Sequence, residues 1–305
     1  DAFLVKFDPA GARQWATYYG ETGDDYGYST TTDASGNVYL AGYTGSAAGI
    51  TSGGFQNIYG GGFSDLFLVK FSPTGGRLWA TYYGGAGNDS GCNLAADASG
   101  NVYLAGYTDS QAGIASGGYD NTFSPGYFSN AFLVKFSTTG ARLWATYYGG
   151  TGGGQTSGYG VATDAAGNVY LGGITDSSGG IASGGFDNTL GGTDAFLVKF
   201  NSAGSRQWAT YYGGAGGFQE RGYVAVDAVG NVYLEGDTYS ASSIASSGFQ
   251  NSLVGLENQY LVCFNTSGSR MCATYYGQDH EEEGTVAVDN IGNVYMCATA
   301  VATTG

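Results

Sequence analysis

Four loops of this chain combine an aromatic side chain with an amide at a fixed spacing. They read GITSGGFQN, GIASGGYDN, GIASGGFDN and SIASSGFQN. An aromatic face beside amide and carboxylate groups suits the ring and hydroxyl groups of a sugar, and we expect the loops to project from one face as equivalent sites. The alternative is that the ring packs its loop onto the sheet while Asn caps a turn. The candidate ligand-binding residues are Phe55, Asn57, Tyr119, Asn121, Phe186, Asn188, Phe249 and Asn251.

Two carboxylates break the pattern of the chain. Glu235 replaces the Ala of a recurring VYLAG segment and Asp237 the Tyr that follows it, so both lie on one face of one expected strand. Glycoside hydrolysis needs two carboxyl groups roughly 5–10 Å apart, which makes a glycosidase the enzymatic alternative. His280 is the only histidine, so Ser-His-Asp centres, Cys-His centres and metal sites with several His ligands are excluded. We expect no catalytic site.

Acidic loops offer a cation site as a further alternative. Residues 278–284 read QDHEEEG, and the pairs Asp24-Asp25 and Asn88-Asp89 lie in other loops. A D-x-D-x-D-G calcium loop is absent from the sequence. The sequence therefore predicts no metal and no cofactor, with calcium as the alternative.

Cysteines give no metal-binding pattern. Cys92, Cys263, Cys272 and Cys297 show no CxxC spacing, which argues against a zinc site. Cys263 and Cys272 fall on the two strands of one expected hairpin. They are either bridged by a disulfide or buried as small apolar side chains, and the sequence leaves both readings open.

A block of about 64 residues, repeated along the chain, positions all these groups. The segment DAFLVKF at Asp1 returns as DLFLVKF at Asp65, NAFLVKF at Asn130, DAFLVKF at Asp194 and NQYLVCF at Asn258. A fixed period of this size means that one supersecondary unit is copied in a ring or a stack. We therefore expect residues 1–305 to form a single domain.

Each repeat reads as two β-hairpins. AFLVKF and RxWATYYG form the first hairpin. A small-residue segment and VYLAGYT form the second, and the DASGN segment joins them. Asp at the first position and Gly at the fourth suit a type I turn. The strands are apolar on both faces, as in a sheet sandwiched between two others, and radial stacking of four-stranded sheets meets that demand. The small-residue strand suits the crowded inner position and the Trp-containing strand the rim. The prediction is an all-β propeller of four-stranded antiparallel blades.

The two ends of the chain predict the number of blades. Residues 1–20 are a hairpin of the first kind, and residues 284–299 are a hairpin of the second kind. Pairing them completes a last blade and closes a five-bladed ring. The alternative is an open fragment of a longer propeller.

Most basic residues recur with the repeat. Nine of the ten Lys and Arg residues occupy two repeat positions, where we expect them to face solvent or to pair with repeat carboxylates. They are Lys6, Lys70, Lys135, Lys199, Arg13, Arg77, Arg142, Arg206 and Arg270.

The elements DAFLVKF, WATYYGG and D-x-x-G-N-V-Y-L-A-G together resemble the bacterial β-propeller repeat known as the SBBP repeat. The resemblance covers all five copies, although the last one has Cys263 for Lys and Cys272 for Trp. It implies a secreted or cell-surface bacterial protein. The family carries no agreed activity and no catalytic motif, and its name refers to seven blades.

Composition narrows the classes of partner. A formal net charge of −15 argues against binding to nucleic acid or to an anionic membrane, and no apolar run is long enough to span a bilayer. The chain begins at Asp1 without Met, as a mature or trimmed product would. We expect a non-enzymatic, extracellular or surface-displayed binding or adhesion module whose partner is a glycan or a surface protein.

The alternative function is structural. A building block of a surface assembly would self-associate through a tyrosine-rich rim, and paired tyrosines recur once in each repeat. The pairs are Tyr18-Tyr19, Tyr82-Tyr83, Tyr147-Tyr148, Tyr211-Tyr212 and Tyr275-Tyr276.

Overall fold

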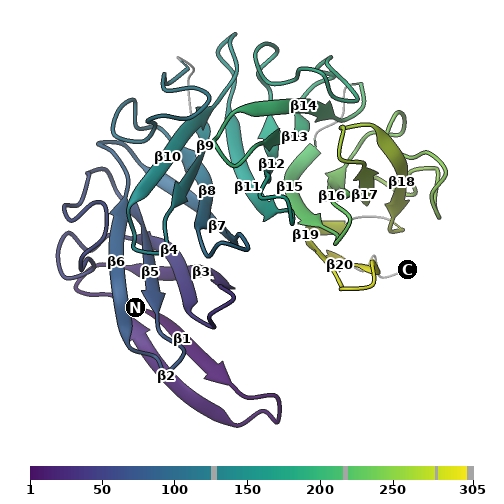
Figure 1. The fold of residues 1–305 in the computed structure, drawn as a ribbon. Helices are drawn as coiled ribbons and strands as arrows, with labels where there is room; N and C mark the ends of the chain where they lie inside the picture. Colours follow the sequence, from purple (N-terminus) through teal and green to yellow (C-terminus); the bar gives the residue numbers. More distant parts are fainter. Residues whose placement is uncertain (125–128, 216–218, 279–280, 301–305) are drawn as a thin grey trace. The chain divides into compact units, whose positions relative to one another are not determined.

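The computed structural model describes residues 1–124, 129–215, 219–278 and 281–300. These residues form twenty β-strands and no helix (Figure 1). The strands are β1 (Ala2–Phe7), β2 (Arg13–Tyr19), β3 (Asp25–Thr32), β4 (Val38–Thr44), β5 (Asp65–Phe71), β6 (Arg77–Tyr83), β7 (Asp89–Ala96), β8 (Val102–Thr108), β9 (Asn130–Phe136), β10 (Arg142–Tyr148), β11 (Thr156–Thr163), β12 (Val169–Thr175), β13 (Asp194–Phe200), β14 (Arg206–Tyr212), β15 (Gln219–Val226), β16 (Val232–Thr238), β17 (Asn258–Phe264), β18 (Arg270–Tyr276), β19 (Glu281–Val288) and β20 (Val294–Ala300).

Sixteen of these strands form four sheets, each with its four strands hydrogen-bonded in chain order. We call them sheet 1 (β3–β6), sheet 2 (β7–β10), sheet 3 (β11–β14) and sheet 4 (β15–β18). The prediction of an all-β fold built from four-stranded antiparallel sheets is confirmed. The small-residue strand and the Trp-containing strand lie at opposite edges of each sheet, because every hairpin pairs with the next one through the two middle strands.

The remaining strands form two separate two-stranded sheets, the N-terminal hairpin (β1–β2) and the C-terminal hairpin (β19–β20). The described residues therefore form no fifth four-stranded sheet, and the count of five blades is not confirmed. The assembly of a last blade from residues 284–299 and 1–20 stays a prediction.

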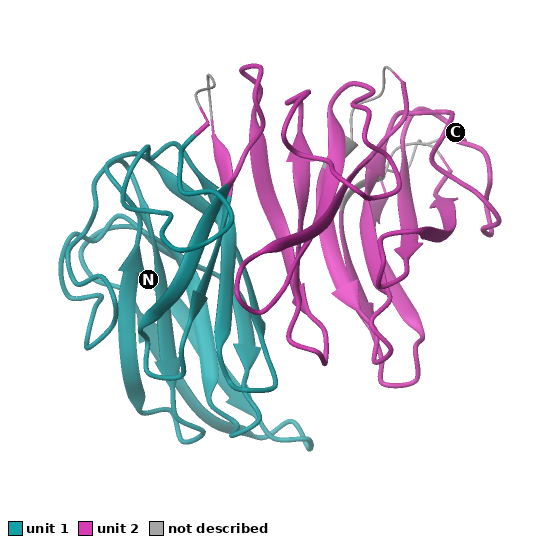
Figure 2. Ribbon diagram, turned by 45° about the horizontal axis from the view of Figure 1, so that its top comes forward, with its two compact units in different colours: residues 1–123, 132–147 teal, residues 124–131, 148–305 magenta. Residues whose placement is uncertain are grey.

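The chain divides into two compact units (Figure 2). Unit 1 comprises residues 1–123 and 132–147 and holds the N-terminal hairpin, sheet 1 and nearly all of sheet 2. Unit 2 comprises residues 124–131 and 148–305 and holds sheets 3 and 4 and the C-terminal hairpin. Each unit has its own apolar core: Leu68 and Phe132 are fully buried in unit 1, and Leu197 and Tyr260 in unit 2.

Register repeats from sheet to sheet. Val38 pairs with Phe71 in sheet 1, Val169 with Phe200 in sheet 3, and Val232 with Phe264 in sheet 4. All seven residues of β5, β9 and β13 are buried, which confirms that these strands are covered on both faces. Identical register means that equivalent side chains occupy equivalent positions, so one repeat describes the chemistry of the others.

The predicted turns are also present. In the first copy, Gly36 N donates to Asp33 O at 2.9 Å, and Asp33 N donates to Asn37 O at 3.1 Å. Gly36 has φ of 76°, a left-handed conformation that glycine adopts without steric cost. The Asp33 carboxylate is thereby fixed at the end of the hairpin, where it contacts a lysine.

Candidate functional site

Buried ion pairs link the repeated lysines to the repeated turn aspartates. The Nζ atoms of Lys70, Lys135 and Lys199 lie 3.1, 3.2 and 3.7 Å from a carboxylate oxygen of Asp33, Asp97 and Asp164, respectively. For these three lysines the predicted pairing with repeat carboxylates is confirmed. All six side chains are less than a tenth exposed, so the pairs lie between layers of the fold rather than at its surface.

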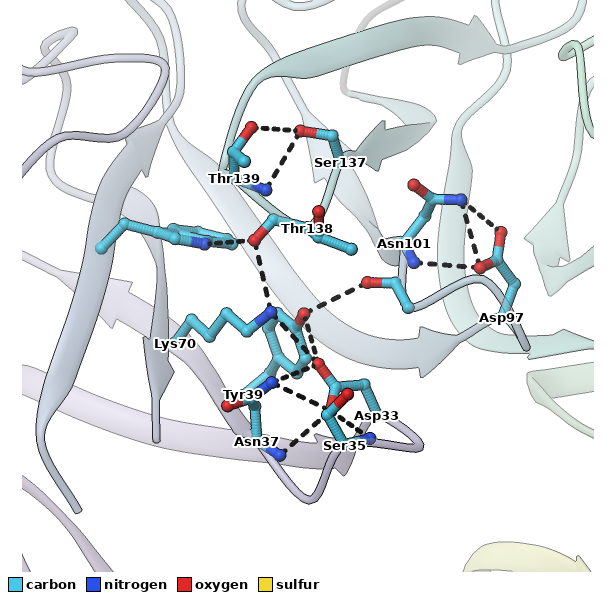
Figure 3. A network of polar contacts seen from close by, with 12 residues as sticks. Asp33, Ser35, Asn37, Tyr39, Lys70, Asp97, Asn101, Ser137, Thr138 and Thr139 are labelled. Atoms are coloured by element: carbon cyan, nitrogen blue, oxygen red, sulfur yellow. Dashed lines mark hydrogen bonds and ion pairs between the residues drawn. The ribbon is translucent and has the colours of Figure 1, made fainter. Parts of the chain in front are cut away.

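The first of these pairs also joins neighbouring sheets (Figure 3). Lys70 Nζ and Trp79 Nε1, both in sheet 1, donate to Thr138 O in the β9–β10 turn of sheet 2 at 3.2 and 3.1 Å. The Tyr39 hydroxyl donates to Asp33 Oδ2, and Lys70 Nζ lies 4.9 Å from the centre of the Tyr39 ring. Burial opposes ionisation of Asp33, but hydrogen bonds from Asn37 and Lys70 outweigh it and lower the pKa of this carboxyl. We call this arrangement the Lys–Trp latch.

Arginines hold the loops that carry the candidate binding residues. The Arg142 guanidinium donates to Gly113 O and Ile114 O at 3.3 and 3.0 Å, and its central carbon lies 4.3 Å from the centre of the Phe55 ring. In unit 2, the Arg270 guanidinium donates to Ser243 O and Ile244 O, both at 3.3 Å, and its central carbon lies 4.3 Å from the centre of the Phe186 ring. A cation over one face fixes each ring in place.

We define the aromatic-Asn loops as residues 45–64, 109–129, 176–193 and 239–257, each between the two middle strands of a sheet. The loop of sheet 1 lies along β6, because Ser52 exchanges both backbone hydrogen bonds with Ala80 at 2.8 and 3.0 Å. Equivalent bonds join Ser183 to Ala209 and Ser246 to Ala273. The loops therefore do not simply project from the fold as expected: each covers the outer edge of its own sheet, whose backbone groups would otherwise be unpaired.

The loop aromatics have one packed face and one partly open face. The Phe55 ring centre lies 6.5 Å from that of Tyr83 in its own sheet and 6.4 Å from that of Phe136 in the next sheet. Phe55 nevertheless remains 39% exposed, and Phe186 in unit 2 remains 42% exposed. Phe249 is 85% exposed and contacts Tyr276 alone among the ring pairs of the described residues.

The asparagines of these loops are all exposed. Asn57 Nδ2 donates to Gly54 O at 3.3 Å, and Asn251 Nδ2 donates to Gly248 O at 3.0 Å. These bonds cap the turn, and in the fourth loop Asn251 Oδ1 also accepts from Gly248 N at 3.3 Å. In each of the four loops the predicted aromatic and its Asn thus lie close together. The aromatic ring is partly packed, and the Asn is exposed.

The paired tyrosines do not form a contact surface. In the four sheets the first tyrosine of each pair is 1% exposed, as Tyr82 and Tyr211 show, and only Tyr18 and Tyr276 are widely open. The Tyr82 hydroxyl donates to Ser46 O at 2.7 Å, and the Tyr83 hydroxyl donates to Ile114 O at 2.6 Å. The tyrosine-rich rim expected from the sequence is therefore wrong, because these side chains turn inward and anchor loops.

Asp25 and Asp89, the first residues of β3 and β7, each bind the loop before the strand and a serine of a later loop. Asp25 Oδ2 accepts from Glu21 N and Ser46 Oγ at 2.8 and 3.1 Å, and Asp89 Oδ2 accepts from Gly85 N and Ser110 Oγ at 2.9 and 3.1 Å. Burial raises the pKa of Asp89 to about 6. Within the described part of the chain, no group of three or more His, Cys, Asp or Glu residues could hold a metal ion. Residues 279–280 and the side chains of residues 281–283, the other predicted cation site, lie outside the description.

The irregular carboxylates of β16 are buried. Glu235 is 0% exposed and Asp237 is 2% exposed. Neither carboxyl oxygen of Glu235 has a hydrogen-bond partner among the described residues, and burial raises its pKa to about 8. Gly284 of β19 lies against Glu235 so closely that a Cβ there would overlap Glu235 Oε1. The side chain therefore lies beneath the C-terminal hairpin, where a polysaccharide does not reach it.

Sequence reasoning did not predict the stacking of arginine on the loop aromatics or the buried position of Glu235. The sequence did hold one indication of the arginine–aromatic contact, because an Arg recurs in every copy of the repeat and the aromatic recurs in four of them. Which neighbouring repeat supplies it depends on the stacking of sheets, which a one-dimensional pattern does not contain.

These features define the chain as a β-propeller repeat protein. Three of its segments, residues 14–47, 78–112 and 143–180, match the family described as "SBBP: Beta-propeller repeat", which confirms the resemblance. The chain is also 24% identical over 361 aligned residues to an uncharacterized WD repeat-containing protein, L264, of Acanthamoeba polyphaga mimivirus. That match covers 98% of this chain and 26% of the relative, so the chain spans about a quarter of its length.

Several solved structures are distantly similar. A polysaccharide lyase of family PL25, an ulvan lyase, has a TM-score of 0.49 and 11% identity, with 92% of this chain and 64% of that chain covered. A protein of unknown function from Dyadobacter fermentans has a TM-score of 0.48 and 9% identity, with 88% and 73% covered. Similarity this low carries no information about activity. No helix in the described residues is both long and apolar enough to cross a membrane.

Proposed function

We propose that this chain is a non-enzymatic binding module, secreted or displayed on a cell surface, whose aromatic-Asn loops bind a glycan. The observation that carries the proposal is the repetition of one arrangement in both units: an aromatic ring backed by arginine at 4.3 Å, about two-fifths exposed, with an exposed Asn two residues later. A ring already fixed by packing loses little conformational entropy when a sugar stacks on it. Several weak sites on one chain act together through effective concentration.

The test is binding of the labelled chain to a glycan array, with and without calcium, followed by a variant with all four asparagines changed to alanine: Asn57, Asn121, Asn188 and Asn251. We expect saturable binding to a few related glycans and at least a tenfold loss in the variant, because loss of one hydrogen bond per site, about 1 kcal/mol, multiplies over linked sites. Because Asn57 and Asn251 cap their turns, the variant should melt at a slightly lower temperature than the wild type and remain folded at the temperature of the binding assay.

Phe63→Ala supplies the matched control for this experiment. Phe63 lies in the loop at residues 45–64 but outside the Phe-x-Asn motif, and it is 91% exposed. Its removal should leave glycan binding unchanged. An array without hits, or equal losses in the two variants, would assign the loops to edge protection alone.

The second candidate function is a building block of a surface assembly, and the unpaired strand edges favour it. In the described structure, β1 and β20 each pair on one side only. Phe3 and Phe7 on β1 are 69% and 59% exposed, and Tyr295 on β20 is 58% exposed. Open edges with apolar side chains are a template for pairing with another strand.

We further propose that the β20 edge pairs with a β1 edge and so completes a fifth four-stranded blade. The Lys–Asp ion pairs of sheets 1, 2 and 3 have a counterpart here that is divided between the two edges, with the lysine on one hairpin and the aspartate on the other. Lys6 Nζ donates to Pro73 O at 3.0 Å but has no carboxylate within 4.0 Å among the described residues. Asp289 accepts from Asn293 and Tyr295 but has no lysine within 4.0 Å in the described part of the chain. The register of β4–β5 places Tyr39 opposite Lys70, so the same register would place Tyr295 opposite Lys6.

An exchange of charges tests this pairing. Lys6→Asp and Asp289→Lys should each lower the midpoint temperature of unfolding, because each places like charges opposite one another across the proposed strand pair, and the double variant should recover most of the loss. Thermal unfolding measures the three variants. Light scattering then measures the molar mass and separates the two arrangements. A monomer would mean that β20 pairs with β1 of the same chain, and a mass that rises with concentration would mean that it pairs with β1 of another chain. Single variants as stable as the wild type would exclude the pairing.

A further inference from the structure

Two cysteines of sheet 4 face each other across neighbouring strands. Cys263 of β17 and Cys272 of β18 are direct cross-strand partners. The same position holds Lys70 and Trp79 in sheet 1 and Lys199 and Trp208 in sheet 3. The two side chains of such a pair point to the same face of the sheet.

Backbone hydrogen bonds define the spacing of this pair. Ala273 directs its N–H and C=O away from β17, since it exchanges hydrogen bonds of 2.9 and 3.0 Å with Ser246. Its neighbour Cys272 therefore directs its own backbone groups toward β17, which makes Cys263 and Cys272 a hydrogen-bonded pair. Such pairs have Cα atoms about 5.5 Å apart, within the range that a disulfide spans without moving the backbone.

We infer that Cys263 and Cys272 are the site of a cross-strand disulfide. Both are free thiols in this structure; Cys263 is 4% exposed, whereas Cys272 is exposed. The accessible Cys272 meets the oxidant and the buried Cys263 completes the bond.

The oxidant is a disulfide of the glutathione class. The Cys272 thiolate attacks one sulfur of this disulfide, a mixed disulfide forms, and the first glutathione thiolate leaves. The Cys263 thiolate then attacks the Cys272 sulfur and releases the second glutathione. Two protein thiols are oxidised to one S–S bond, and one glutathione disulfide is reduced to two thiols.

The disulfide would stabilise sheet 4 at the point where its latch is missing. In sheet 3, Lys199 Nζ and Trp208 Nε1 donate to Thr266 O of sheet 4 at 3.2 and 3.1 Å. Sheet 4 has cysteines in place of both donors, so its outer hairpin cannot make this contact. A disulfide would instead join the two strands of this hairpin, β17 and β18, covalently. This inference does not depend on the proposed glycan site.

Oxidation followed by peptide mapping tests the inference. The folded chain is incubated with oxidised glutathione, remaining thiols are alkylated under denaturing conditions, and trypsin is added without reductant. Arg270 separates the two cysteines, so cleavage gives residues 222–270, with Cys263, and residues 271–305, with Cys272 and Cys297. We expect these peptides to be joined, with a mass two hydrogens below their sum, and no glutathione to remain.

Serine variants identify the partner of Cys263. The joined peptides should persist in Cys297→Ser and disappear in Cys272→Ser, where glutathione adducts or free thiols take their place. The reverse result would assign the bond to Cys297. Full alkylation of Cys263 and Cys272 in the wild type after oxidation, or glutathione retained on Cys272, would overturn the inference.

Discussion

As pH rises from 5 to 8, the Glu235→Gln variant should lose about 3 to 4 kcal/mol less stability than the wild type. The pKa of Glu235 is raised from 4.5 to about 8 in the folded chain because the carboxyl is buried. Below pH 4.5 the carboxyl is protonated in both the folded and the unfolded states and contributes no difference. As pH rises from 5 to 8, the unfolded state releases its proton while the folded state retains it, so the unfolded state is favoured increasingly.

Urea denaturation at pH 5, 6, 7 and 8 measures this effect. The free energy of unfolding of the wild type should fall with pH, and the difference between wild type and Glu235→Gln should change by about 3 to 4 kcal/mol over the series. The exposed Glu21 gives a matched control, since Glu21→Gln should follow the wild type at every pH. A constant difference between wild type and Glu235→Gln would show that the carboxyl is solvated in the folded chain.

Removing the ammonium group of the Lys–Trp latch should destabilise unit 1 by about 3 kcal/mol. Lys70→Met keeps an apolar chain of similar length but leaves the Asp33 carboxylate, 8% exposed, without its cation. An uncompensated buried charge costs roughly 3–5 kcal/mol, and the low end applies because Asn37 and Tyr39 still donate to Asp33. Tryptophan fluorescence in urea reports the change, since the indole of Trp79, one of four in the chain, donates to the same Thr138 carbonyl.

A double-mutant cycle separates the ion pair from simple packing. Asp33→Asn removes the negative charge and keeps side-chain oxygen and nitrogen atoms at the turn. In the double variant the two single losses should not add, with a coupling of at least about 1.5 kcal/mol. Additive losses would mean that Lys70 acts through its methylene chain and the Thr138 carbonyl alone.

The repeat predicted the sheets from the sequence because its period and its turns both depend on local chemistry. Gly36 and Asn37 follow Asp33 at the spacing that a type I turn requires, and the structure contains that turn. Alternation within VYLAGYT and AFLVKF gave strands with apolar side chains on both faces, which the buried β5 confirms. Local signals of this kind need no knowledge of which sheets are neighbours.

The candidate sites were less predictable because their character depends on neighbouring sheets. Phe55 is fixed by Arg142, which lies 87 positions later, and no pattern within one repeat indicates that contact. Glu235 was read as half of an open carboxylate pair, yet it is buried under Gly284 from another hairpin. The sequence pattern puts Tyr82 and Tyr83 on a contact surface. Their hydroxyl groups instead donate to carbonyl groups far along the chain, and the stacking of the sheets determines those contacts.

The acceptor of the Lys–Trp latch has a consequence for how such a chain can change in evolution. Lys and Trp donate to the main-chain oxygen of Thr138 in sheet 2 and of Thr266 in sheet 4, and the N-terminal hairpin donates to that of Pro73 in sheet 1. A main-chain oxygen is present whatever the side chain. A copy that carries the Lys and Trp can therefore make this contact with whichever copy follows it, without compensating substitutions, and this favours changes in copy number by duplication and deletion of whole segments.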